Sequence, residues 1–395
     1  MFDLDLVRSA FPALASGFVF LDNAGGSQTL AGVADRVRDY LLTTNVQLGA
    51  SYAVSEAAGE RVRAAVRATA TYIGTDDPHE VVFGSSTTQL IGNLALAMAP
   101  GLSPGDEIVV TTADHHANVG AWQRLAARGV VIRTWELDRE TRLLEQRDLL
   151  PLLNDRTRLV AFTHVSNVLG SIHDVAAITR IVHAHGAKVC VDGVAFAPHR
   201  ELDVRAWDVD YYVFSFYKVY GPHLAVLYGK HELLDGLATI NHDFIGNELP
   251  YKLQPGNLNF ELTYSVTAIY DYLERLGGKV RAFHEIAAHE ERLAGPLLAF
   301  LDNRRGVTIH GERAADRSRR VPTISFSVEG LVPEAIVRAV DRSGIGIRHG
   351  DFYAKGLVRA LGLDQRGGVV RISMAHYNTS TEIERAITAL DRELG

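Results

Sequence analysis

One lysine in this sequence is placed where it could form a covalent bond to an aldehyde. Lys218 follows the apolar, strand-like segment 211–214, and a second apolar segment, 187–191, ends directly before Asp192. Because both predicted strands are buried, the amine and the carboxylate can meet in one pocket. This pair fits pyridoxal phosphate (PLP), whose aldehyde binds a lysine and whose ring nitrogen pairs with an acid. A turn or helix-capping role is the alternative for Asp192.

A phosphate site is predicted at the turn after the short strand 81–83. Ser86, Thr87 and Thr88 lie between this strand and a predicted helix over 89–99. Amides at a helix N-terminus and hydroxyl side chains both donate hydrogen bonds to anions. The same residues also fit an ordinary N-cap. The motifs at the other strand ends favour the anion site.

Three further polar residues lie in or just after predicted strands. His115 could stack on a cofactor ring, and Asn167 could donate a hydrogen bond to a ring oxygen or simply occupy a turn. Arg371 presents a guanidinium fork that matches the carboxylate of an α-amino acid, with a structural ion pair as the alternative. Parallel α/β sheets bind ligands beyond the carboxyl ends of their strands, where His115 and Asn167 lie.

Neither a metal site nor a reactive thiol is predicted. His115 and His116 are adjacent, so their side chains diverge, and no spaced carboxylate completes a ligand set. Cys190 is the single cysteine and lies inside the apolar segment 187–191, where an inert thiol is expected. One cysteine excludes an internal disulfide and is typical of a reducing cytoplasm.

Composition excludes several classes of function. The chain of 395 residues has a formal net charge of -7 and 47% hydrophobic residues. It has no basic run for nucleic-acid phosphates and no apolar stretch of membrane-spanning length. The N-terminus lacks the basic flank and apolar core of a signal peptide. We therefore expect a cytoplasmic protein with no nucleic-acid or membrane partner.

Strands and helices alternate through the first half of the chain. This alternation predicts an α/β domain with a mostly parallel sheet covered by helices on both faces. The predicted strands are 81–83, 107–111, 130–135, 158–163, 187–191 and 211–214. The predicted helices are 56–73, 89–99, 119–128, 145–153 and 174–185.

The last third of the chain has a different pattern. Residues 262–301 are predicted to be mainly helical, with a break near Gly277-Gly278. An α+β pattern follows, with strands at 306–309, 321–328, 345–348 and 369–374 and helices at 333–343 and 380–393. We therefore expect a large α/β domain over residues 16–290 and a smaller α+β domain formed by residues 1–15 and 291–395.

Taken together, the motifs resemble those of the class V aminotransferases of PLP fold type I, in particular the SUF-type cysteine desulfurases. The resemblance covers nearly the full length of the chain. It rests on Leu21-Asp-Asn-Ala24, Ser86-Thr-Thr88, Asp114-His-His-Ala-Asn118, His164-Val-Ser-Asn-Val-Leu-Gly170, Val191-Asp-Gly193, Ser215-x-x-Lys218 with Tyr220-Gly-Pro222, and Arg371 with Tyr377-Asn-Thr379. It implies a large domain with a mostly parallel seven-stranded sheet, a smaller C-terminal α+β domain, and a homodimer with active sites at the interface.

The resemblance also implies a role for each site residue. Lys218 would form the Schiff base, Asp192 would bind the ring nitrogen and His115 would stack on the ring. Asn167 would face the ring hydroxyl and the substrate, and Arg371 would bind the substrate carboxylate. The other residues placed at the cofactor or the substrate are Ser86, Thr87, Thr88, Ser215, Tyr217, Arg348 and, reaching the phosphate of the partner subunit, Asn257.

The sequence departs from the desulfurase pattern at three positions. Tyr353 stands in the loop after Arg348, where desulfurases carry the cysteine that accepts sulfur. Tyr217 replaces the histidine that usually precedes the lysine, and Ala195 replaces a glutamine that touches the ring hydroxyl. Without a thiol in this loop, persulfide chemistry is not expected.

These observations predict an enzyme that acts on an amino acid. An external aldimine would form, and Lys218 would remove the Cα proton as a general base. Loss of a β-substituent would then make the protein a cysteine-desulfurase-like β-lyase, with Tyr353 and Tyr217 as nearby phenolic proton donors. An aminotransferase and an amino-acid epimerase are the enzymatic alternatives, and a PLP-binding regulatory protein is the non-enzymatic one. A Rossmann dehydrogenase is disfavoured because no G-x-G-x-x-G follows a first strand.

Overall fold

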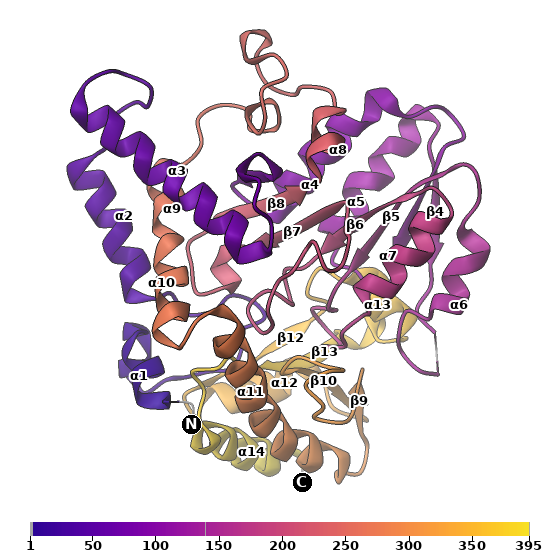
Figure 1. Ribbon diagram of the computed structural model, residues 1–395. Coiled ribbons are helices and arrows are strands. Elements are labelled where there is room, and N and C mark those ends of the chain that lie inside the picture. The colour runs from indigo at the N-terminus through magenta and orange to yellow at the C-terminus, as the bar shows by residue number, and fades with distance from the viewer. Residues whose placement is uncertain (1–2, 139, 395) are drawn as a thin grey trace.

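The computed structural model describes residues 3–138 and 140–394, which form two main sheets joined through a long helix (Figure 1). The larger sheet has seven strands in the order β2-β8-β7-β6-β5-β3-β4. Their bounds are β2 Val81–Gly84, β3 Glu107–Thr111, β4 Val131–Trp135, β5 Thr157–Thr163, β6 Lys188–Asp192, β7 Tyr211–Ser215 and β8 Ala225–Gly229.

The predicted mostly parallel, seven-stranded sheet is confirmed. Strands β4, β3, β5, β6 and β7 run parallel to one another, whereas β8 is antiparallel to both β7 and β2. Strand β8 was not predicted from the sequence, although its five residues are all buried. The short apolar run that forms β8 does not show the direction of the strand. That direction depends on where the preceding turn places the chain relative to the sheet.

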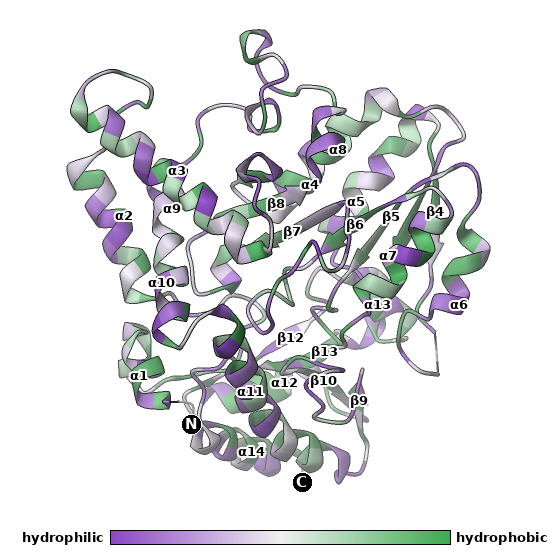
Figure 2. Cartoon of the chain, in the orientation of Figure 1, coloured by the Kyte–Doolittle hydropathy of each residue, from purple (hydrophilic) through white to green (hydrophobic). Residues whose placement is uncertain are grey.

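Two hydrophobic layers sandwich this sheet, because alternate side chains of a strand point to opposite faces. Val189 and Val191 of β6 pack on the layer that contains α7 (Val175–Ala184) and α3 (Ala53–Ile73). Cys190, between them, packs on the layer that contains α4 (Thr87–Met98) and α5 (Ala117–Gln123). Figure 2 shows the hydrophobic colouring along β5, in the middle of the sheet.

Several helices differ from their predicted bounds. The predicted helix 119–128 is α5 followed by a 3-10 turn over Arg124–Arg128, and the one at 145–153 is α6 (Gln146–Leu149) followed by a 3-10 turn. The remaining helices before the C-terminal part are α1 (Leu4–Ser9), α2 (Ala31–Thr43) and α8 (His231–Asp235), none of which was predicted. Helix α2 packs against α9 (Phe260–Ser265).

The predicted break in the helical segment 262–301 is confirmed. Helices α10 (Thr267–Arg275) and α11 (Lys279–Asp302) flank Gly277 and Gly278, which both have positive φ, a conformation that glycine adopts without strain. Helix α11 runs from the large sheet to the smaller one (Figure 1).

The smaller sheet has four antiparallel strands in the order β12-β13-β10-β9. Their bounds are β9 Val307–His310, β10 Thr323–Val328, β12 Arg348–Gly350 and β13 Val369–Ser373; helices α12 (Pro333–Asp341), α13 (Lys355–Ala360) and α14 (Ser380–Leu394) accompany them. The predicted strand 345–348 was wrong in extent. Its first part is β11 (Ile345–Gly346), which pairs with the N-terminal β1 (Val19–Phe20), and β12 begins at Arg348.

A separate hydrophobic core fills this part of the molecule and includes residues of β1, β10, β13, α11 and α14. The domain boundaries at 15–16 and 290–291 stay predictions. Within the described residues, no helix combines the length and the hydrophobicity needed to cross a membrane.

Candidate active site

A pocket at the carboxyl ends of β5, β6 and β7 gathers most of the predicted site residues. Its walls include Ser86, Thr87, Thr88, His115, Asn167, Asp192, Ser215, Tyr217 and Lys218. These residues span more than a hundred positions of sequence, and the parallel strands bring them to one edge of the sheet. Most of the predicted site residues therefore share one cavity, which does not include Arg348, Tyr353, Arg371 or Asn257.

Lys218 lines this cavity and is the last residue of the 3-10 turn that follows β7. Its Nζ donates a hydrogen bond to the backbone oxygen of Ala24 over 2.5 Å. Burial, and next the positive charge of Arg371, lower the pKa of Lys218 to about 8. A lysine with this pKa is half in the free amine form at about pH 8, and the free amine is the form that reacts with an aldehyde.

Asp192 ends β6 on the same side of the sheet. Its side chain accepts a hydrogen bond of 2.9 Å from the amide of Val194. Burial raises the pKa of Asp192 to about 6, against the lowering effects of the Val194 amide and of Lys218. A buried carboxylate of this kind gains most from a cationic partner such as a protonated ring nitrogen.

The other end of the cavity is built for an anion. Ser86 caps α4, and its Oγ accepts from the amide of Gln89 over 3.1 Å. The hydroxyls of Thr87 and Ser215 lie 2.7 Å apart at the start of this helix. Hydroxyl donors at the N-terminus of a twelve-residue helix fit a phosphate group.

Two residues lie between these ends. Burial lowers the pKa of His115 to about 4, so its imidazole is neutral at physiological pH and can lie against an aromatic ring. Asn167 donates through Nδ2 to the backbone oxygen of Phe352 over 2.9 Å. Its Oδ1 is buried and has no hydrogen-bond partner among the described residues. A buried amide oxygen without a donor fits a site completed by a bound ligand.

A wider opening adjoins the cavity and brings Arg348, Tyr353 and Arg371 to Lys218 and His115. Arg371 is buried and donates from Nη2 to Asp22 Oδ1 over 2.8 Å, while Arg348 Nη1 lies 3.7 Å from Asp22 Oδ2. Asp22 belongs to the motif Leu21-Asp-Asn-Ala24, but no role was predicted for it from the sequence.

Two further contacts hold the Arg371 side chain in place. Its Nη1 donates to the backbone oxygen of Asn167 over 3.1 Å, and its guanidinium lies 3.8 Å from the ring centre of Phe352. The fork is thus fixed in orientation before any substrate arrives. Phe352 was also missed, since no spacing signal links it to Arg371.

The environments of Tyr353, in the loop beside the cavity, and of Cys190, in β6, differ. Both Phe352 and Tyr353 have positive φ (52° and 59°), and the Tyr353 side chain is 68% exposed. Cys190, in contrast, is fully buried in β6, and burial raises the pKa of its thiol. The predicted inert state of Cys190 agrees with this environment.

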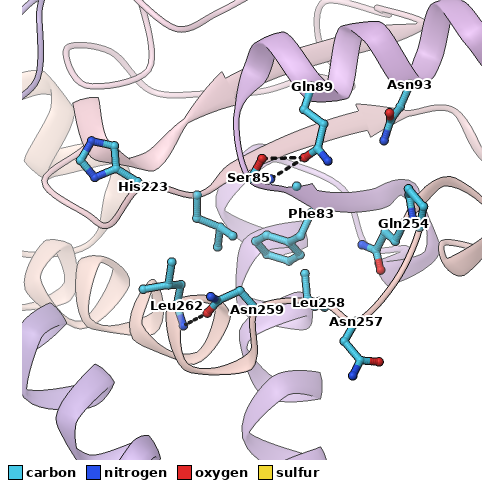
Figure 3. A pocket seen from close by; sticks show the side chains of 13 residues that line it. Phe83, Ser85, Gln89, Asn93, His223, Gln254, Asn257, Leu258, Asn259 and Leu262 are labelled. Atoms are coloured by element: carbon cyan, nitrogen blue, oxygen red, sulfur yellow. Dashed lines mark hydrogen bonds between the residues drawn. The ribbon is translucent and has the colours of Figure 1, made fainter.

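Asn257 lies outside the cavity of its own chain. It lines a neighbouring pocket with Phe83, Gln89 and His223 (Figure 3), and its amide exchanges hydrogen bonds with Gln47. Its contact with the phosphate of a partner subunit stays a prediction.

The residues present fit PLP: a buried amine, a buried acid, a neutral imidazole and a helix N-terminus with hydroxyls converge on one cavity. The family model described as aminotransferase class-V matches residues 19–386. The chain belongs to this family. It is accordingly a PLP-dependent enzyme with the type I fold.

Three comparisons show how this class-V aminotransferase family member relates to known proteins. It is 42% identical over 405 residues to the aminotransferase-like protein FGM3 of Gibberella zeae, covering 100% of this chain and 99% of that protein. It is 33% identical to the cysteine desulfurase-like protein ustD of Aspergillus flavus, with 98% and 90% covered. The structure of the cysteine desulfurase CsdA of Escherichia coli superimposes with a TM-score of 0.86, 29% identity and 100% and 99% coverage.

The lowered pKa of Lys218 has a measurable consequence. Below about pH 8 the amine is mostly protonated and unreactive, and above it the amine is mostly free. The rate at which PLP reattaches to the cofactor-free protein should therefore rise with pH to a midpoint near 8, whereas an ordinary lysine, with a pKa of about 10.4, would keep rising to pH 10. The Arg371→Gln variant should move the midpoint upward, because the charge of Arg371 lowers this pKa. A midpoint near 10 in the unaltered protein would contradict the assignment.

Proposed function

We propose that this PLP-dependent enzyme is a β-lyase that removes a β-substituent, such as a thiol, from an amino acid without forming a persulfide. The observation that carries the proposal is the position of the single cysteine thiol. The loop beside the cavity presents Tyr353, and the cysteine Cys190 is sealed inside β6. Sulfur released at the cavity therefore meets no protein thiol that could accept it.

The side chains around the cavity support the first part of such a reaction. Bound PLP supplies an aldehyde that condenses with amino groups and a ring that accepts the electrons released at Cα. Lys218 Nζ, freed when an amino acid takes its place, accepts the Cα proton. Arg371 holds the substrate carboxylate, and Asp192 keeps a proton on the ring nitrogen.

The opening beside the cavity supports the second part. Tyr353 lines it from the loop, and Tyr217 lines both the cavity and the opening. Burial raises the pKa of Tyr217, so its phenol keeps its proton and can donate it to a departing group. Water has access to the exposed Tyr353 side chain, which allows a small leaving group to escape.

The test is a product analysis of the purified enzyme with β-substituted amino acids, among them L-cysteine and O-acetyl-L-serine. Elimination releases the substituent with pyruvate and ammonia in equal amounts. The Cys190→Ser variant should release sulfide from L-cysteine at a rate within about twofold of the unaltered enzyme, since the buried thiol takes no part.

Three results would contradict the proposal. One is a keto acid that keeps the whole carbon skeleton of the substrate, formed once per active site, which indicates transamination. Another is exchange of the Cα proton with inversion and no release of a substituent, which indicates epimerisation. The third is loss of sulfide release in Cys190→Ser, which would show that a persulfide is formed after all.

A further inference from the structure

A cluster of two histidines and one aspartate lies away from the cofactor cavity. Asp77, His79 and His231 place one possible ligand atom each within 4.8 Å of one another. Over residues 3–138 and 140–394, no other group of three His, Cys, Asp or Glu side chains is arranged in this way. No local sequence pattern indicates this cluster, because Asp77 and His231 are 154 positions apart.

The edge of the large sheet brings these residues together. Asp77 and His79 belong to the 3-10 turn Pro78–Glu80 and its cap, which lead directly into β2. His231 begins α8 just after β8. Since β2 and β8 are antiparallel, with Val81 opposite Tyr228, the start of one strand adjoins the end of the other.

The carboxylate of Asp77 contacts both imidazoles. Asp77 Oδ1 lies 2.9 Å from His79 Nδ1, and Asp77 Oδ2 lies 2.6 Å from His231 Nδ1. Hydrogen bonds from backbone amides hold these residues in place. Asp77 Oδ1 accepts from the amide of His79 over 2.9 Å, and the amide of His231 donates to Glu80 Oε1 over 3.1 Å. The two imidazoles therefore contact different oxygens of the Asp77 carboxylate.

The surrounding charges leave this carboxylate available to a cation. In the described part of the chain, the ion pairs of Asp77 are those to the two histidines. The neighbouring Glu80 is neutralised by Arg205, 2.9 Å away, so that arginine does not compete for Asp77. The side chains of His79, His231 and Asp77 are 57%, 50% and 30% exposed, which gives an ion and its waters access from solvent.

We propose that Asp77, His79 and His231 bind a divalent transition-metal ion of the zinc type. Imidazole nitrogens and one carboxylate oxygen suit such an ion better than the all-oxygen sets preferred by magnesium or calcium. Three protein ligands leave at least one position for water. The ion would tie the start of β2 to the end of β8, at the opposite end of this strand pair from Gly84 and the phosphate cradle, so it would stabilise the sheet edge and take no part in the reaction at Lys218.

Titration calorimetry of the full-length holoenzyme with ZnCl₂ tests the proposal. We expect one Zn²⁺ per chain, with the affinity reduced at least about tenfold in His231→Ala and in His79→Ala, because each removes one of three ligands. The matched control is His284→Ala on α11, whose exposed histidine is outside the cluster and should leave binding unchanged.

Thermal unfolding gives a second readout that does not depend on activity. Zn²⁺ should raise the Tm of the unaltered protein and of His284→Ala, since a ligand that binds the folded state stabilises it, but not that of His231→Ala. Absence of Zn²⁺ binding to the holoenzyme, or equal binding in His231→Ala and the unaltered protein, would overturn the proposal. Neither result would bear on the β-lyase assignment, whose products are measured without added metal.

Discussion

Replacing Lys218 with alanine is expected to abolish covalent attachment of the cofactor and to lower kcat/KM by at least about 10³-fold. The side chain provides both the nucleophile for the aldehyde and the base for Cα, and general base catalysis alone contributes about 10² to 10⁴-fold. No second lysine lines the cavity within the described residues. Borohydride reduction followed by intact-mass measurement should show the mass of the bound cofactor in the unaltered protein and none in Lys218→Ala.

Lys188→Ala is the matched control for this experiment. Lys188 is exposed at the start of β6, the strand that ends at Asp192. This variant therefore tests whether loss of a lysine elsewhere in the same sheet affects cofactor attachment or kcat/KM. Its mass gain and its kcat/KM should equal those of the unaltered protein. Retention of the cofactor mass in Lys218→Ala would show that another amine carries it, and the active-site assignment would then be wrong.

Replacing Asp192 with asparagine is expected to lower kcat about 10² to 10³-fold while PLP stays attached to Lys218. The carboxylate is buried, and it stabilises a proton on the ring nitrogen, whereas a neutral amide cannot. Loss of one preorganised electrostatic partner in a buried site typically costs about this factor. Steady-state kinetics, together with the borohydride mass measurement, separates lost chemistry from lost cofactor.

Asp114→Asn provides the control for burial and charge. Asp114 is also a buried acid, and burial raises its pKa well above the usual range, but it does not line the cofactor cavity. Replacing it with a neutral amide should change kcat far less than the Asp192 substitution does. Equal losses in the two variants would mean that Asp192 acts by packing and not by its charge.

Much of the fold could be predicted from local patterns. Buried parallel strands are continuous apolar runs, so β3 was predicted at its full length and β5 and β6 to within one residue at their ends. The break at Gly277 and Gly278 was visible because two adjacent glycines rarely continue a helix. Strand β8 was missed, because its direction and its pairing with β2 depend on contacts that no local window contains.

The active-site cavity, like the fold, could be predicted only in part from local sequence patterns. Lys218, Asp192, His115 and Asn167 could be assigned because each follows a recognisable strand, and the resemblance to a known family gave them roles. That they share one cavity is a property of the strand order β7-β6-β5-β3. The pairing of Asp22 with Arg371 joins residues 349 positions apart, and the pattern around either one does not predict it.

Residue types and their order along the chain are enough to show which chemistry is available: a lysine and an acid at strand ends, hydroxyls before a helix, and a tyrosine in place of a loop cysteine. These are facts of residue type and order. The tertiary structure alone decided the reactivity of these groups, because pKa shifts at Lys218 and Asp192 arise from burial and from charges contributed by distant segments. It also decided the cluster at Asp77, since antiparallel pairing of β2 and β8 brings together ligands that the chain keeps far apart.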